Sequence, residues 1–144
     1  MKKLCTCFLL VSALVFSTIL SGCSNSNAKI DGKTVVELVQ YKPEAVAVFE
    51  QLAEKFNATH DDIYLKVDSP NDAMTILKTM FIREDYPDII GIGGDINYSY
   101  FIDSNILADV SDYPGLQKIK PAYVDILEGL EFVPTEGTFG VPFV

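Results

Sequence analysis

Two groups of side chains in this sequence carry acid and base functions close together. Glu128 and Glu131 are three residues apart, and His60 is followed directly by Asp61 and Asp62. Paired carboxylates or a histidine beside an acid can transfer protons in hydrolysis. However, a three-residue spacing of acids is typical of the solvated face of a helix. The histidine lies in a predicted turn, and no Gly-x-Ser-x-Gly nucleophile motif is present. We therefore predict that the chain is not an enzyme.

Metal and cofactor chemistry has equally little support. The sequence has one His and three Cys, and two of the cysteines, Cys5 and Cys7, lie in the apolar stretch at its start. That is too few ligands for a typical zinc site. The acidic pairs Asp61-Asp62 and Asp109/Asp112 lack the spacing of a calcium loop. Gly91, Gly93 and Gly94 are not followed by the Lys-Ser/Thr of a phosphate-binding loop. No cofactor is expected.

Length and charge limit the remaining classes. The 144 residues suffice for one ordinary domain, and the 11 basic and 20 acidic residues give a net charge of −9. Nucleic-acid binding is disfavoured, since it requires basic residues that replace counterions on phosphates.

The first 22 residues have the pattern of an export signal. Lys2 and Lys3 precede an uncharged apolar run from Leu4 to Leu20, which ends in the small residues Ser21-Gly22. A positive start, an apolar core and a small-residue cleavage site are typical of a secretory leader. An uncleaved anchor helix is the alternative interpretation.

The sequence Leu20-Ser21-Gly22-Cys23 resembles the lipobox of bacterial lipoproteins. This resemblance implies that the Cys23 thiol receives a diacylglyceryl group and that cleavage makes Cys23 the amino terminus. Acyl chains would then hold the protein on the extracytoplasmic side of the cell membrane. A Gram-positive surface and a periplasm both fit. The polar residues up to Lys33 are expected to form a linker, so the predicted parts are 1–22, 23–33 and 34–144.

Strand and helix patterns alternate after the linker. β-branched or alternating apolar segments predict strands, and apolar residues three or four apart predict helices. The expected strands are 34–40, 63–67, a short central strand 87–92 and 137–144; the expected helices run from Pro43 to Phe56, with a break at 57–62, and over 73–81, 98–106 and 121–130. This order predicts an α/β fold with a parallel-rich sheet and helices on both faces.

Two strand ends are candidate ligand contacts. In open α/β sheets, ligands bind beyond the carboxyl ends of the strands. Tyr41 follows the first strand and could stack on a sugar, while Asp95 follows Gly93-Gly94 and could accept hydrogen bonds from hydroxyls. Each has a structural alternative: Tyr41 as a packing residue, and Asp95 as a turn or helix-cap residue.

The order of several segments resembles the family 1 extracellular solute-binding proteins. The resemblance lies in Leu52-Ala53-Glu54-Lys55-Phe56-Asn57, Tyr86-Pro87-Asp88-Ile89-Ile90, Leu107-Ala108-Asp109-Val110-Ser111 and Phe139-Gly140-Val141-Pro142-Phe143. It implies a periplasmic-binding-protein-like first lobe and a non-catalytic, lipid-anchored receptor that captures a sugar or oligosaccharide for an ABC-type importer. The partners implied are a small-molecule solute, the permease subunits and the membrane. The strand-end positions implied as ligand-binding are Tyr41, Lys42, Asp68, Asp95 and Phe143.

The family would cross to a second lobe near Val144, where this sequence stops. The expectation is therefore an incomplete lobe, the amino-terminal part of a receptor, arising from an incomplete gene, a frameshifted copy or a truncated product. A non-functional truncated copy is one alternative. Another is a small surface lipoprotein that binds a protein partner through exposed Tyr98, Tyr100 and Phe101; packing of these rings within the helix is the structural explanation of the same residues.

Overall fold

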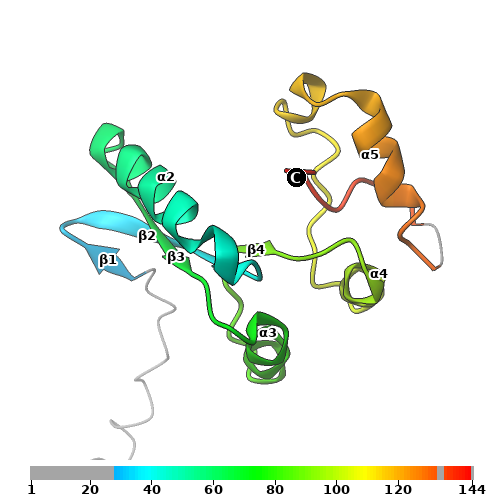
Figure 1. Cartoon of the computed structure of the whole chain (residues 1–144), viewed down its shortest axis with the longest axis horizontal. Coiled ribbons are helices and arrows are strands. Elements are labelled where there is room, and N and C mark those ends of the chain that lie inside the picture. Colours follow the sequence, from blue (N-terminus) through cyan, green and yellow to red (C-terminus); the bar gives the residue numbers. More distant parts are fainter. Residues whose placement is uncertain (1–27, 133–134, 144) are drawn as a thin grey trace, which may run out of the picture.

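A computed structural model describes residues 28–132 and 135–143 of the chain. The proposed leader and Cys23 lie outside these residues. Along the described chain the elements are β1 (Lys29–Ile30), β2 (Lys33–Gln40), the 3₁₀ turn η1 (Pro43–Ala45), α2 (Val46–Thr59), β3 (Ile63–Asp68), α3 (Ala73–Ile82), β4 (Ile89–Gly91), α4 (Ile96–Asp103), η2 (Leu116–Lys118) and α5 (Pro121–Glu128). Figure 1 shows the sheet and α2 on one side of the molecule and α4, α5 and the end of the chain on the other. No helix in this described part is long and apolar enough to cross a bilayer.

The sheet is built around β2. This strand pairs in parallel with β3, from Thr34 opposite Ile63 to Val39 opposite Asp68. Its carboxyl end pairs in parallel with β4, and its start pairs antiparallel with β1. The parallel-rich α/β fold predicted from the sequence is therefore confirmed. The prediction that segment 87–92 is a central strand is wrong, because β4 is three residues long and pairs only with β2 within the described sheet.

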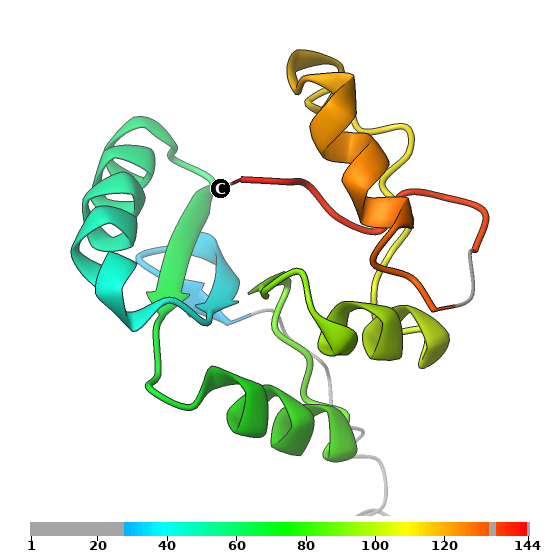
Figure 2. The same ribbon diagram turned by 45° about the vertical axis from the view of Figure 1, so that its right-hand side comes forward.

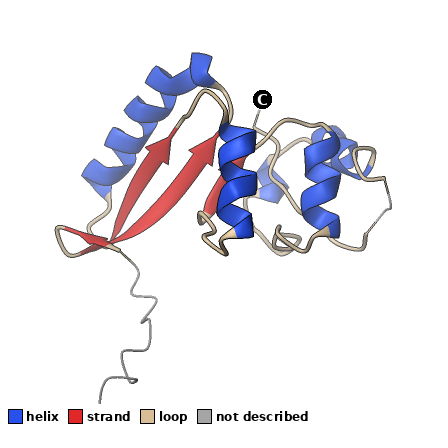
Figure 3. Cartoon of the chain, turned by 90° about the horizontal axis from the view of Figure 1, so that it is seen from below, coloured by secondary structure: helices blue, strands red, loops and turns tan. Residues whose placement is uncertain are grey.

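Helices cover both sides of this sheet, as predicted. From β2 the chain passes through α2 to β3 on one side of β2. It then returns through α3 to β4 on the other side of β2. Because both crossovers are right-handed but run in opposite directions along the sheet, the two helices lie on opposite faces. Seen from below, α2 and α3 lie on opposite sides of the strands (Figure 3).

The end of the predicted linker belongs to the sheet. Residues 29–33 form a tight hairpin in which Asp31 and Gly32 both have positive φ, at 52° and 82°. An Asp-Gly pair tolerates this left-handed backbone and is typical of a two-residue hairpin turn. The expectation of a polar linker reaching Lys33 is thus wrong for these residues.

The helix α2 continues past its predicted break. The Asn57 side chain accepts a hydrogen bond from the Leu65 backbone N–H at 2.7 Å and donates one to the Leu65 carbonyl at 2.9 Å. Asn57 therefore stays helical and joins α2 to β3. The helix ends at Thr59, and the ring of His60 stacks on Phe56 at 3.8 Å.

The predicted strand at 137–144 is absent from described residues 135–143. Figure 2 shows this segment leaving the region of α5 and running back toward the sheet as an extended loop. Its backbone is tied instead to the 107–110 segment, since Val110 donates a hydrogen bond to the Thr138 carbonyl at 2.7 Å. A segment becomes a strand of a sheet only where a neighbouring strand pairs with it, and the described residues 135–143 pair with none of the strands.

The buried core consists of aliphatic and aromatic side chains from the sheet and the helices. Leu77 of α3 and Phe101 of α4 are fully buried, and the rings of Phe101 and Phe81 meet edge to face at 5.2 Å. Tyr98 is also buried, whereas Tyr100 is 54% exposed. The alternative of an exposed aromatic anchor on this helix is therefore wrong for Tyr98 and Phe101, which pack inward.

Candidate functional site

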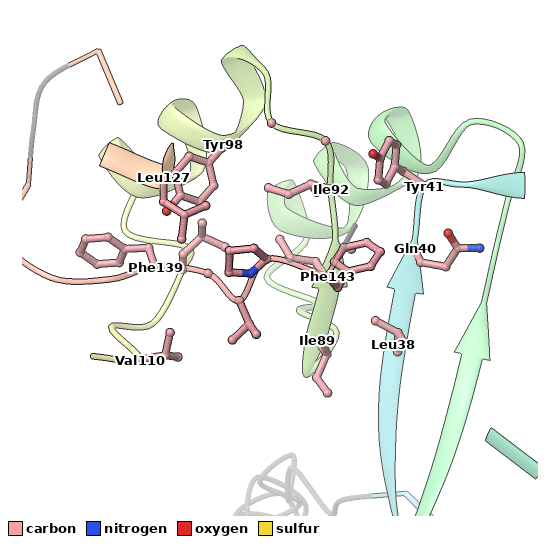
Figure 4. Close-up of a pocket in the computed structure, with 18 of the residues that line it drawn as sticks. Leu38, Gln40, Tyr41, Ile89, Ile92, Tyr98, Val110, Leu127, Phe139 and Phe143 are labelled. Carbon is pink, nitrogen blue, oxygen red and sulfur yellow. The ribbon is translucent and has the colours of Figure 1, made fainter. Parts of the chain in front are cut away.

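A hollow of about 680 Å³ lies between the carboxyl end of the sheet and the unit formed by α4, α5 and the end of the chain. Figure 4 shows side chains from all of these parts around it. The lining comes from the end of β2, from β4 and the glycines after it, from α4 and α5, and from the final segment: Leu38, Gln40, Tyr41, Lys42, Ile89 to Gly94, Tyr98, Tyr123, Ile126, Leu127, Leu130 and Phe139 to Phe143, among others. Most of these side chains are apolar, with a few polar groups, as in typical small-molecule sites.

Gln40 shapes the loop that leaves β2. Its side chain is buried, and Nε2 donates hydrogen bonds to the Lys42 carbonyl at 2.8 Å and to Ser69 Oγ at 2.6 Å. The Oε1 atom accepts from the Lys42 backbone N–H at 2.5 Å. One side chain thus binds both the backbone N–H and the backbone carbonyl of Lys42, and it connects the ends of two parallel strands. Gln40 fixes the direction in which Tyr41 and Lys42 leave the sheet.

Tyr41, Lys42 and Phe143 come together at this rim. The Lys42 ammonium lies 5.7 Å from the Tyr41 ring centre and 5.9 Å from the Phe143 ring centre. Phe143 also meets Phe49 of α2 edge to face at 6.2 Å. Cations are attracted to aromatic faces at such separations. The rings of Tyr41 and Phe143 and the ammonium of Lys42 therefore form one edge of the hollow, which we call the rim. Phe143 is about 100 residues away from the other two in sequence.

The glycines after β4 allow a close approach of backbone to side chains. A Cβ atom at Gly94 would lie 3.0 Å from Leu130 Cδ1, and one at Gly93 would lie 3.4 Å from the Tyr41 ring. The first contact is tighter than an ordinary van der Waals contact and the second is not, so the close approach favours glycine at position 94.

The two predicted carboxylates do not line the hollow. Asp95 is the cap that directly precedes α4: its Oδ1 accepts from the Asn97 backbone N–H at 2.8 Å, and its Oδ2 would lie 3.5 Å from a Cβ atom at Gly93. Asp68 ends β3 and is exposed. Neither residue belongs to the lining of the hollow. Of the five predicted ligand-binding residues, the structure brings together Tyr41, Lys42 and Phe143. Within the described residues, no three His, Cys, Asp or Glu side chains gather as a metal site would require.

Tyr98 is a lining residue that the sequence singled out only as part of an exposed protein-binding anchor or as helix packing, and not for binding a solute. It is 4% exposed, and its hydroxyl has no hydrogen-bond partner among the described residues. Burial raises the pKa of Tyr98 to about 12; the charge of Glu131 adds to the rise, and the backbone N–H of Phe139 opposes it. Its spacing on α4 signals only that it is buried. Gln40 was likewise missed, although a polar residue that ends an apolar strand is a usable signal.

A carboxylate holds the final segment in place. Asp109 Oδ1 accepts hydrogen bonds from the Ser111 backbone N–H at 2.9 Å and from the Thr138 backbone N–H at 3.0 Å, and it also accepts one from the Ser111 hydroxyl. The hydrogen bond from the Ser111 hydroxyl, followed by those from the two backbone N–H groups, lowers the pKa of Asp109. This network fixes Thr138, directly before the residues that line the hollow.

Comparisons with known proteins agree with this architecture. No protein-family model matches the chain. A multiple sugar-binding protein of Streptococcus mutans is 32% identical over 78 residues, which are 53% of this chain and 19% of that protein. The chain resembles one part of a family 1 extracellular solute-binding protein. The solved structure that carries this family name, from Alicyclobacillus acidocaldarius, matches 77% of the chain and 28% of its own length, with a TM-score of 0.61 and 14% identity.

Two structures of the solute-binding protein RafE show the same partial likeness. Apo RafE from Streptococcus pneumoniae has a TM-score of 0.62 at 22% identity and covers 69% of this chain. RafE in complex with raffinose has a TM-score of 0.60 at 23% identity. At these identities the structural likeness establishes the fold. The chain spans less than a third of the length of each of these solute-binding proteins.

Proposed function

We propose that this chain is the sugar-contacting part of the first lobe of a lipid-anchored solute-binding protein. It captures a sugar or oligosaccharide for an ABC-type importer and performs no covalent chemistry. The observation that carries the proposal is the rim of Tyr41, Lys42 and Phe143 over an apolar hollow at the carboxyl end of the sheet. The 32% identity to a multiple sugar-binding protein supports the choice of ligand.

The rim matches the chemistry of a sugar. A pyranose ring has an apolar face that packs on an aromatic side chain, and hydroxyls around its edge that need hydrogen-bond partners when water is removed. Tyr41 supplies the aromatic face and a hydroxyl, and the Lys42 ammonium supplies donors. Phe143 is 51% exposed, so apolar surface is still available at the rim.

The membrane attachment in this proposal is a lipid on Cys23. Residues 28–33, which follow it closely, form the β1–β2 hairpin at the edge of the sheet. That hairpin is at the amino end of β2, whereas the rim lies after its carboxyl end. Docking on a permease belongs to the same proposal.

Saturation-transfer NMR with raffinose tests sugar capture. This method detects weak binding, which is suitable because a single wall removes less water from a ligand than a closed cleft does. We expect raffinose signals to gain saturation from the protein, and the gain to fall severalfold in Tyr41→Ala. The matched control is Tyr113→Ala, since Tyr113 is 52% exposed and does not line the hollow. Equal transfer in both variants, or none in the unchanged protein, would contradict the proposal.

A further inference from the structure

Lys42 is the one basic side chain among the described residues that line the hollow. It is half-buried, and its ammonium makes no ion pair within residues 28–132 and 135–143. The ammonium is 5.7 Å from the centre of the Tyr41 ring and 5.9 Å from that of the Phe143 ring. Aromatic faces attract a cation, but they do not neutralise its charge. The rim therefore presents a positive charge that is available to an anion.

The acidic side chain of the lining is engaged elsewhere. Asp88 is the one acid among the described lining residues, and its Oδ2 accepts a hydrogen bond from the Glu37 backbone N–H at 2.8 Å. Glu37 precedes Gln40, the last residue of β2, by three positions, which is about 10 Å along a strand. Lys42 follows Gln40 in the loop beyond the strand. The positive charge of the hollow is thus concentrated at the rim.

We propose that the Lys42 ammonium pairs with a carboxylate of the bound sugar, so that the chain prefers a sugar with a uronic acid residue over its neutral counterpart. This inference rests on the proposed function and narrows its class of ligand. Figure 4 shows the rings of Tyr41 and Phe143 near the carboxyl end of β2. A uronic acid has an apolar ring face that packs on such a ring and a carboxylate at its edge for the ammonium. Hydrogen bonds between charged partners are roughly twice as strong as neutral ones.

A carboxylate suits this rim better than a phosphate does. One ammonium balances one negative charge, and the backbone N–H of Lys42 is already donated to Gln40 Oε1. The chain carries a net charge of −9, so the protein as a whole repels a doubly charged group more strongly than a singly charged one. The same surplus of acids limits the preference to the short range of the Lys42 ammonium. Neutral sugars such as raffinose still bind through the rings and the hydroxyls.

The test compares methyl β-D-glucuronide with methyl β-D-glucoside, two sugars that differ by a carboxylate in place of a CH₂OH group. Binding of each is measured by NMR titration of the ¹⁵N-labelled protein at neutral pH. We expect the glucuronide to bind roughly fivefold more tightly, which is about 1 kcal/mol. The variant Lys42→Gln removes the charge and keeps an N–H donor, so this preference should disappear.

Two further variants are the controls. Lys42→Arg keeps a positive charge at the rim and should retain the preference for the glucuronide. Lys78→Gln removes the same charge from the exposed surface of α3, outside the lining of the hollow, and should also retain it. The comparison therefore separates the charge of Lys42 from the net charge of the protein.

The possible failures are distinguishable. If neither raffinose nor the two glycosides bind, both the proposed function and this inference are overturned. If a sugar binds but the glucuronide binds no more tightly than the glucoside, the function stands and the pairing with Lys42 is rejected. If the preference persists in Lys42→Gln, or is lost in Lys42→Arg or Lys78→Gln, the Lys42 charge is not its cause and the inference is overturned.

Discussion

The buried amide of Gln40 reaches across two parallel strands and donates a hydrogen bond to Ser69 Oγ at 2.6 Å. The same amide accepts from the backbone of Lys42 and donates to its carbonyl. The loop that presents Tyr41 and Lys42 to the hollow is therefore fixed from within the sheet. The position of Tyr41 and Lys42 at the rim therefore depends on Gln40, which is itself buried.

Replacing Gln40 with Ala should destabilise the protein by about 1–3 kcal/mol, because the polar groups of Lys42 and Ser69 lose their partner in a partly buried place. Urea unfolding measures the change. The control is Gln51→Ala on the exposed surface of α2, which should stay within about 0.5 kcal/mol. Equal stability of the two variants would mean that the loop is held by other contacts.

The fold was largely predictable because its signals are local. β2, β3, α3 and α5 have regular apolar patterns, and the Asp72 cap of α3 is visible in the sequence. The predicted strand at 137–144 failed because strand formation depends on a neighbour, which no local pattern reports. The hairpin at 29–33 was overlooked although Asp31-Gly32 is a recognised turn signal.

The candidate site was predictable only in part, since it depends on tertiary contacts. Tyr41, Lys42 and Phe143 were placed in strand-end loops and do meet at one rim. Asp95 has the local geometry of a cap, which was the alternative interpretation of that residue. The place of Tyr98 in the wall of the hollow was not predicted, because it depends on distant segments that pack around this residue.

Leu77 tests the packing of α3 on the sheet. It is fully buried, so Leu77→Ala should cost about 2–5 kcal/mol through lost apolar burial and the cavity that remains. Ile82→Ala is the control on the same helix, because Ile82 is 84% exposed and should change stability by less than about 0.5 kcal/mol. A small loss at Leu77, comparable to that at Ile82, would show that α3 does not pack as described.

The hydrogen bonds to the Asp109 carboxylate should make the stability of the folded protein depend on pH. Its pKa in the folded protein is lower than the ordinary value of 3.8, so its contribution is fully present above that value and is lost as the pH falls through the folded-state pKa. We expect the stability difference between the unchanged protein and Asp109→Asn to shrink from pH 6 to pH 3, measured by denaturant unfolding at each pH.

The matched control for this pH series is Asp112→Asn, three residues further along the same exposed loop. It is outside the hydrogen-bond network that holds Thr138. A difference for Asp109→Asn that stays constant with pH, or grows toward acid, would contradict the assigned role of this carboxylate.

Lipidation at Cys23 predicts a cellular phenotype. In bacteria fed with labelled palmitate, the unchanged protein should carry the label and partition into detergent. Cys23→Ser should lose both properties, since a hydroxyl does not replace the thiol in thioether formation. Cys7→Ser, a change of the same kind within the proposed leader, is the control and should keep the label. Label that persists in Cys23→Ser would refute this attachment site.

The most direct test of sugar capture is a map of backbone amide shifts when raffinose is added to the ¹⁵N-labelled protein. The account predicts concentration-dependent shifts at Lys42, Gly93 and Val141, which surround the hollow, and none at Val48 or Leu52 on the exposed face of α2. Shifts confined to α2, or a spectrum unchanged at saturating sugar, would contradict the claim that this hollow captures a sugar.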